Sequence, residues 1–144
     1  MTYWRLYYHV VWSTKHRLPV IDERIETILL RAIPGIARET GCLTHAVGIM
    51  PEHVHLAVSI PPRVAVADAI KTIKGSSSHL LNHERADSSG TWQGWQNEYG
   101  VISFTEKALP TVIEYVTHQD AHHAAGTIIA GFEREERDRE STNA

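Results

Sequence analysis

Apolar and polar residues alternate along the segment from Leu6 to Thr14. One set of alternate positions carries Leu6, Tyr8, Val10 and Trp12, and the other carries Tyr7, His9, Val11 and Ser13. Successive side chains of a strand leave on opposite faces, and aromatic and β-branched residues are frequent in strands. The pattern therefore predicts a first strand over this segment.

A helical pattern follows. Asp22 is a candidate N-cap, and four apolar residues recur at helical spacing after it, namely Ile25, Ile28, Leu29 and Ile33. Pro34 and Gly35 come next, and a proline inside a helix removes a backbone donor and clashes with the preceding turn. We therefore predict an imperfect first helix that is kinked or interrupted at Pro34 and Gly35 and that ends before Gly41.

Two short strands are predicted at residues 43–50 and 53–60. Pro51 and Glu52 join them closely enough for an antiparallel hairpin. In the second strand, Val54, Leu56 and Val58 occupy alternate positions and are expected to point to the core. The other set of alternate residues, which begins with His53 and His55, is expected on the opposite face.

Helical spacing returns after Pro61 and Pro62 and continues from Val66 to about Arg85. A polar loop over residues 86–97 leads to a strand at about residues 98–105. Pro110 suits the first turn of a last helix, which we expect to run to near residue 125 and to stop at Gly126. The predicted order is β-α-β-β-α-β-α.

The first six elements match the split βαβ plan of an α+β fold. In this ferredoxin-like (RRM-like) arrangement, helices cover one face of an antiparallel sheet and the other face can remain open. The last predicted helix is added to this plan and carries Tyr115. An open sheet face suits extended nucleic acid, but a fold of this kind hosts many unrelated functions. The function must therefore be argued from the site residues.

Length and composition indicate one domain without disulfides. The chain has 144 residues, of which 42% are apolar, and Cys42 is its single cysteine. It begins without a basic region followed by an apolar run, and no stretch reaches the roughly 20 apolar residues of a membrane helix. We expect a cytoplasmic protein without a membrane partner, with one domain over residues 1–126 and a charged tail over residues 127–144.

The formal net charge of −3 is not evenly distributed. Through Lys107 there are 11 Lys and Arg against 10 Asp and Glu, whereas from Ala108 onward there are 3 against 7. The acidity therefore belongs mostly to the C-terminal part, where residues 131–144 read as a solvated helix or a frayed tail. A nucleic-acid partner is not excluded by the overall charge.

Candidate chemistry is concentrated in two places. His53 and His55 lie two residues apart on a predicted strand, so their side chains share a face and can bind one metal ion. Tyr115 and Gln119 lie four residues apart and would share a helical face, as a nucleophile beside a third ligand. Each of these two candidate sites has an ordinary alternative. A lone His-x-His pair is often an ordinary part of a surface or core, and a tyrosine is common on the face of a half-buried helix.

The order of motifs points to a known family. The segments that carry the resemblance are YHVVWSTKHRLPVI at residues 8–21, MPEHVHLAVSIPP at 50–62, IKGSSSHLL at 73–81, YGVISFT at 99–105 and YVTHQDAHH at 115–123. The chain resembles the IS200-like transposases, which are single-tyrosine HUH transposases of small insertion sequences that move as single-stranded DNA. The resemblance implies that His53 and His55 are the HUH metal ligands, Gln119 the remaining protein ligand and Tyr115 the nucleophile. It also implies a homodimer.

The chemistry implied by this resemblance is metal-assisted transfer of a DNA strand. A divalent cation, Mg²⁺ or Mn²⁺, would reduce the charge repulsion around a phosphodiester. Tyr115 would then form a 5'-phosphotyrosine and release a 3'-hydroxyl, with His118 and His122 as candidate helpers or as exposed polar residues. In the family the tyrosine helix can dock on the partner subunit, which would place Tyr115 in trans.

Several residues are candidates for DNA contacts. Lys15, Arg17, Lys71, Lys74 and Lys107 could hold phosphates, and Trp92 and Trp95 could stack on unpaired bases. The resemblance singles out the segment around Lys74. Ordinary solvation of the basic residues and packing of the tryptophans on the core remain open alternatives.

The leading functional hypothesis is a transposase that cleaves and rejoins single-stranded DNA at hairpins marking the ends of an element. A domesticated REP-associated tyrosine transposase is a close variant. A noncatalytic module that binds single-stranded nucleic-acid hairpins is the alternative from another class. A replication initiator or relaxase with the same chemistry is a third, although its usual further domains are absent from this sequence.

Overall fold

The computed structural model describes residues 2–84 and 92–118. The strands are β1 (Tyr7–Ser13), β2 (Leu43–Ile49), β3 (His53–Ser59) and β4 (Gly100–Phe104). The α-helices are α1 (Glu23–Glu39), α2 (Val66–His83) and α3 (Leu109–Thr117), and two short 3₁₀ helices are η1 (Lys15–Arg17) and η2 (Glu106–Ala108). The predicted order of strands and helices is confirmed, with boundaries that shift by one or two residues for most elements.

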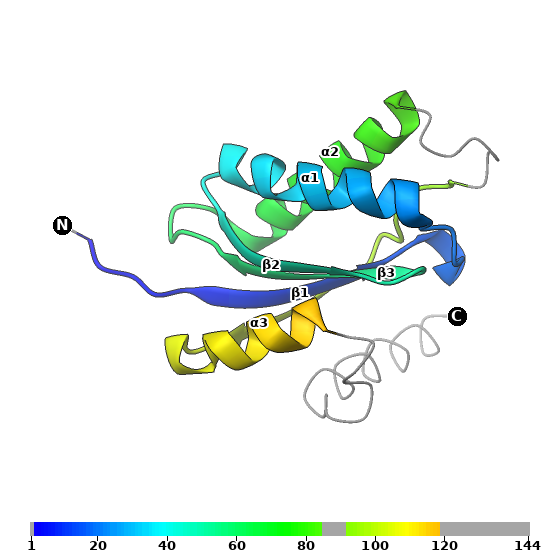
Figure 1. Cartoon of the computed structure of the whole chain (residues 1–144). Helices are drawn as coiled ribbons and strands as arrows, with labels where there is room; N and C mark the ends of the chain where they lie inside the picture. Colours follow the sequence, from blue (N-terminus) through cyan, green and yellow to red (C-terminus); the bar gives the residue numbers. More distant parts are fainter. Residues whose placement is uncertain (1, 85–91, 119–144) are drawn as a thin grey trace, which may run out of the picture.

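The four strands form one antiparallel sheet in the order β2-β3-β1-β4. This is the strand order of a ferredoxin-like fold, so the predicted α+β class is confirmed. Helices α1 and α2 lie on one face of the sheet, and α3 lies on the other (Figure 1). The second face, which can remain open in this fold, is partly covered by α3, which contacts β2 and β3.

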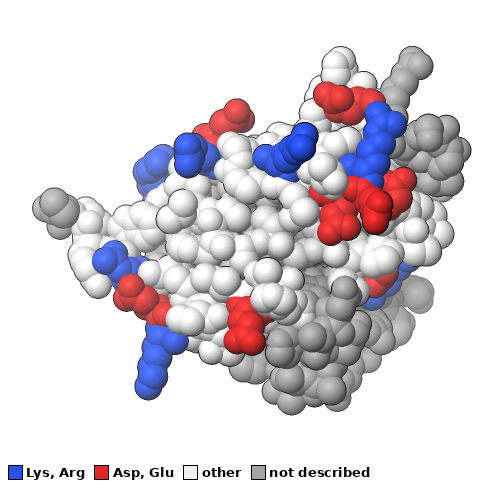
Figure 2. Space-filling view, viewed as in Figure 1, with Lys and Arg blue, Asp and Glu red and all other residues white. Residues whose placement is uncertain are grey.

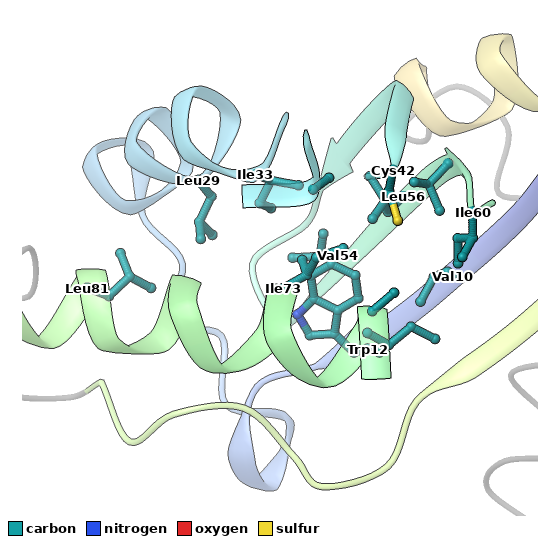
Figure 3. Packing of buried hydrophobic residues seen from close by; sticks show 14 of the residues in the cluster. Val10, Trp12, Leu29, Ile33, Cys42, Val54, Leu56, Ile60, Ile73 and Leu81 are labelled. Carbon is teal, nitrogen blue, oxygen red and sulfur yellow. The ribbon is translucent and has the colours of Figure 1, made fainter. Parts of the chain in front are cut away.

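The core lies between the sheet and the pair of helices α1 and α2. Figure 3 shows Trp12 in the middle of this cluster, together with residues from the two helices and the central strands. Val54, Leu56 and Val58 are fully buried, as their alternation along β3 predicted. Burial of such apolar side chains contributes about 1.5–3 kcal/mol each. The same alternation turns His53 and His55 to the face that α3 covers.

Helix α1 is continuous through Pro34, so the expected interruption is wrong. Pro34 and Gly35 lie on the exposed side of the helix, between the buried Ile33 and Ala37. Water can therefore solvate the carbonyl group whose helical hydrogen bond the proline removes. Packing of the apolar stripe on α2 and β2 keeps the helix intact, and Asp22 caps it by accepting a hydrogen bond from the Ile25 amide at 2.9 Å, as predicted.

Helix α3 is shorter than predicted. It ends at Thr117, and His118 departs from helical geometry with φ −120° and ψ 46°. The expectation of one continuous helix from Pro110 to near residue 125 is therefore wrong. The proposed stop at Gly126, the domain boundary there and the charged tail over residues 127–144 lie outside the described residues. Within the described part of the chain, no helix is long and apolar enough to span a membrane.

Candidate active site

The two histidines of the HxH pair lie side by side on the face of β3 that is turned away from the core. Their ring centroids are 4.8 Å apart. The neighbouring strand β2 places Gly48 opposite His55, and Ala46 opposite Ala57. These small residues leave room above the sheet for the imidazole rings and for a helix. The prediction that His53 and His55 share one face is confirmed.

Each histidine has a side-chain partner at its Nδ1 atom. Glu52 Oε1 lies 2.9 Å from His53 Nδ1, and His9 Nε2 lies 2.9 Å from His55 Nδ1. A metal ion would therefore have to be bound through the other ring nitrogen, Nε2, of both residues. His9 was not selected from the sequence as a site residue. Its alternation with Tyr7, Val11 and Ser13 on the first strand was the signal that could have found it.

Burial keeps two of these imidazoles neutral at neutral pH. His9 and His55 are 4% and 1% exposed. Burial lowers the pKa of His9 from 6.5 to about 4. Burial is also the largest cause that holds the pKa of His55 well below 6.5, followed by the charges that His9 and His53 would carry. The neutral imidazole is the form that binds a metal, so His55 can bind one without releasing a proton.

Tyr115 lies over the same pair of rings. Its ring centroid is 6.0 Å from that of His55 and 6.2 Å from that of His9, in both cases edge to face. Helix α3 is held on β2 and β3, where Val116 is fully buried and Pro110 lies in the first turn. The structure thus brings the candidate nucleophile and a candidate ligand together within one chain.

Part of the expected ligand set is not described. Gln119 and His122 lie outside the described residues. His118 is exposed, and its Nδ1 lies 3.3 Å from the carbonyl oxygen of Glu114, one turn earlier. Among residues 2–84 and 92–118, no group of three or more His, Cys, Asp or Glu side chains is arranged to hold a metal. The described donors are therefore two imidazoles, which suit Mn²⁺ better than Mg²⁺ but do not complete a coordination shell.

The candidate phosphate contacts differ in their surroundings. Lys15, Lys71 and Lys107 are exposed, and Arg17 is half-buried at the end of η1. Lys74 is only 9% exposed, and its Nζ donates to the carbonyl oxygens of Gln96, Asn97 and Glu98 at 2.6, 3.1 and 3.1 Å. This arrangement favours a structural role, in which Lys74 holds the segment before β4 against α2.

Trp92 and Trp95 pack against the hydrophobic core. The Trp95 ring meets those of Trp12 and Trp92 edge to face at 5.9 and 4.7 Å, and its Nε1 donates to Ser77 Oγ at 3.0 Å. The alternative that these residues fasten the loop to the core is thereby supported. Trp95 also borders a surface cleft of about 460 Å³, together with Lys71, Ser78, Asn97 and Tyr99.

Charged side chains are mixed over the visible surface. On the face seen in Figure 2, acidic and basic side chains of the described residues surround a broad uncharged area. Nonspecific binding to nucleic acid normally draws on a basic surface. On this face the described residues form no continuous basic stripe.

The chain is similar in sequence to known transposases. A sequence model of the family described as Transposase IS200 like matches residues 2–119. The ISDra2 transposase TnpA of Deinococcus radiodurans is 27% identical over 119 residues, which cover 81% of this chain and 85% of that protein. The transposase of insertion sequence element IS200 from Salmonella typhimurium is 26% identical over 128 residues, covering 82% of this chain and 79% of that protein.

Two solved structures have a similar fold. One is a crystal structure of a protein from Deinococcus radiodurans R1 assigned as a transposase, with a TM-score of 0.64 and 26% identity over 87% of this chain and 97% of that one. The other is a REP-associated tyrosine transposase bound to a REP hairpin, with a TM-score of 0.60 and 17% identity over 86% of this chain and 75% of that one. The second similarity concerns the fold alone.

Proposed function

The chain belongs to the IS200-like transposase family, and we propose that it cleaves and rejoins single-stranded DNA with Tyr115 as the nucleophile. The observation that carries this proposal is the position of the Tyr115 ring, 6.0 Å from the ring of His55 within the same chain. His55 is one of the two candidate metal ligands, so this position puts the candidate nucleophile beside the candidate metal site. Metal-assisted attack on a phosphodiester needs a nucleophile and a metal ion close together.

We propose that His53 and His55 hold a divalent metal ion through their Nε2 atoms, with Gln119 as a further ligand. The donors fit the group, because both Nδ1 atoms are directed to other partners and the buried His55 is neutral at neutral pH. A bound Mg²⁺ or Mn²⁺ would neutralise charge on the phosphate and orient the scissile bond. The mixed nitrogen and oxygen donors favour Mn²⁺ at equal concentration.

The residues of the chain then carry out one exchange of ester bonds. The Tyr115 hydroxyl loses its proton and its oxygen forms a bond to phosphorus, while the bond from phosphorus to the 3'-oxygen breaks. The 3'-oxygen takes up one proton and leaves as a 3'-hydroxyl, so protons balance as well. The number of phosphoester bonds is unchanged, so a 3'-hydroxyl can later reverse the step without a nucleotide cofactor. Helix α3 holds Tyr115 above His55, while the apolar side of the helix is packed on the sheet.

We propose a DNA hairpin as the substrate and a homodimer as the working assembly. Two findings support a hairpin substrate. The structurally similar REP-associated tyrosine transposase is bound to a REP hairpin, and this chain belongs to the IS200-like transposase family. In a dimer, Tyr115 could attack in trans if α3 moved to the partner subunit. Within one chain the described site already combines Tyr115 with His55, so cis attack needs no such movement.

The test is a denaturing gel for a covalent adduct between the full chain and labelled single-stranded DNA from the flanks of its gene, with Mn²⁺ or Mg²⁺. We expect an adduct that requires the metal and is absent from Tyr115→Phe and His53→Ala. Tyr3→Phe is the matched control, because Tyr3 is 77% exposed and far along the chain from the site. Tight hairpin binding without any adduct from the wild-type chain would instead favour the noncatalytic binding module.

A further inference from the structure

His9 lies beneath both candidate groups of the active site. It is on β1, opposite Ala57 of β3 and Ile102 of β4. The small Ala57 side chain leaves space for the His9 ring to lean along the sheet toward His55, and the two ring centroids are 5.0 Å apart with nearly parallel planes. The Tyr115 ring meets His9 edge on at 6.2 Å. His9 therefore contacts a candidate ligand and the candidate nucleophile at once.

The hydrogen bond between His9 and His55 needs a proton on one of the two facing nitrogen atoms and a lone pair on the other. His9 Nε2 and His55 Nδ1 are 2.9 Å apart, so one of them donates and the other accepts. If His55 is to bind a metal through Nε2, that nitrogen must expose its lone pair, and the proton of the neutral ring must lie on Nδ1. His9 Nε2 is then the acceptor.

We propose that His9 is a positioning residue whose Nε2 accepts a hydrogen bond from His55 Nδ1 and so holds His55 with Nε2 toward the metal and Tyr115. This inference rests on the proposed function, because it assigns a role to His55 as a ligand. The tautomer of a metal-binding histidine is set by the hydrogen bond at its other nitrogen. At His53 the carboxylate of Glu52 holds the equivalent position. At His55 the partner is a neutral, buried imidazole.

The chain offers a conservative variant, a disruptive one and a matched control. His9→Gln can place an amide oxygen close to the original Nε2, whereas His9→Phe keeps a ring but removes the acceptor. His45→Phe is the control, because His45 lies next to Tyr7 and Ser59 on the same sheet and has no described contact with His53 or His55. All three variants keep the full chain, and circular dichroism verifies that each is folded.

The direct readout is the tautomer of His55 in the metal-free chain, measured by long-range ¹⁵N–¹H NMR of its imidazole. We expect the Nδ1–H form in the wild type, in His9→Gln and in His45→Phe, and a mixture of forms in His9→Phe. An unchanged Nδ1–H form in folded His9→Phe would overturn the proposal. A wild-type His55 that carries its proton on Nε2 would overturn it as well. If His9→Phe does not fold, the wild-type spectrum still tests the proposal, because a proton on His55 Nε2 would overturn it.

The second readout is the affinity for Mn²⁺ without DNA, measured by calorimetry. Loss of such a partner of a metal ligand typically weakens binding about 10–100-fold, and we expect this for His9→Phe. His9→Gln should lose less, and His45→Phe should bind as the wild type does. Mn²⁺ affinity in His9→Phe equal to that of the wild type would contradict the proposal. A wild-type chain that binds no Mn²⁺ would instead refute the metal site itself, while the NMR result would still decide the role of His9.

Discussion

Replacement of Lys74 by Met should destabilise the fold, although a surface lysine would tolerate the change. Methionine keeps most of the aliphatic stem but removes the ammonium group that donates to the carbonyls of Gln96, Asn97 and Glu98. A hydrogen bond from a charged group contributes about 1.5–3 kcal/mol net. Asn97 and Glu98 are exposed, so water can replace part of what they lose.

We therefore expect Lys74→Met to lower the free energy of unfolding by about 2–3 kcal/mol, which is less than the sum for three hydrogen bonds. For a domain of this size, that change lowers Tm by roughly 10 °C. Lys71→Met is the matched control, because Lys71 is exposed one turn earlier on α2 and should change stability by less than about 0.5 kcal/mol. Differential scanning calorimetry measures both variants.

The Lys71 and Lys74 variants should also differ in how they affect DNA binding. Lys71→Met should weaken hairpin binding in a salt-dependent way without a change in Tm, since a single phosphate contact changes the salt dependence by about one unit. Lys74→Met should affect binding only through the loss of the folded segment before β4. Equal Tm values for the wild type and Lys74→Met, together with a loss of affinity, would refute the structural role and restore Lys74 as a direct DNA contact.

The remaining predictions concern acid, the core and the metal. The pKa of His9 is about 4 in the folded state and about 6.5 in the unfolded state, so the neutral ring contributes fully to stability above pH 6.5. As the pH falls from 6.5 toward 4, the unfolded state takes up a proton that the folded state does not, and urea unfolding should show a loss of up to about 3 kcal/mol in the free energy of unfolding. Constant stability between pH 6.5 and 4 would contradict this. Leu29→Ala should lower the free energy of unfolding by about 2–5 kcal/mol, because Leu29 is fully buried. Leu30→Ala should lower it far less, because Leu30 is 42% exposed. Similar urea midpoints for the two variants would contradict the described packing of α1. Chelation by EDTA should abolish adduct formation, and added Mn²⁺ should restore it at least as well as Mg²⁺; activity that survives chelation would argue against the metal.

The periodic parts of the fold were predictable from the sequence because their burial is regular. Alternation along β1 and β3 separates Trp12 and Val54 from His53 and His55, and this single pattern located both the core and the histidine pair. Pro34 misled the prediction, since the cost of a proline in a helix interior is smaller where water can solvate the carbonyl group that loses its hydrogen bond, and packing elsewhere on the helix can outweigh what remains. That condition depends on which side of the helix faces water, and tertiary packing decides it.

The side-chain network of the site could be predicted only in part. The contact between His9 and His55 joins two strands separated by 46 positions in sequence, so only the strand order brings the residues together. The resemblance singled out the segment around Lys74, but no local sequence pattern shows that this lysine donates hydrogen bonds to three carbonyl groups of a later loop. Tyr115 was a candidate nucleophile from its spacing to Gln119, and the resemblance assigned it that role. The position of its ring over His55 depends on the placement of α3 across the sheet.

The most direct test of the central claim is to map the covalent bond itself. After reaction with single-stranded flanking DNA and nuclease trimming, trypsin should release residues 108–134, in which Tyr115 is the only tyrosine. Tandem mass spectrometry should place a nucleotide on Tyr115, linked through its 5'-phosphate. A nucleotide on another residue, or one joined through a 3'-phosphate, would contradict the proposed function.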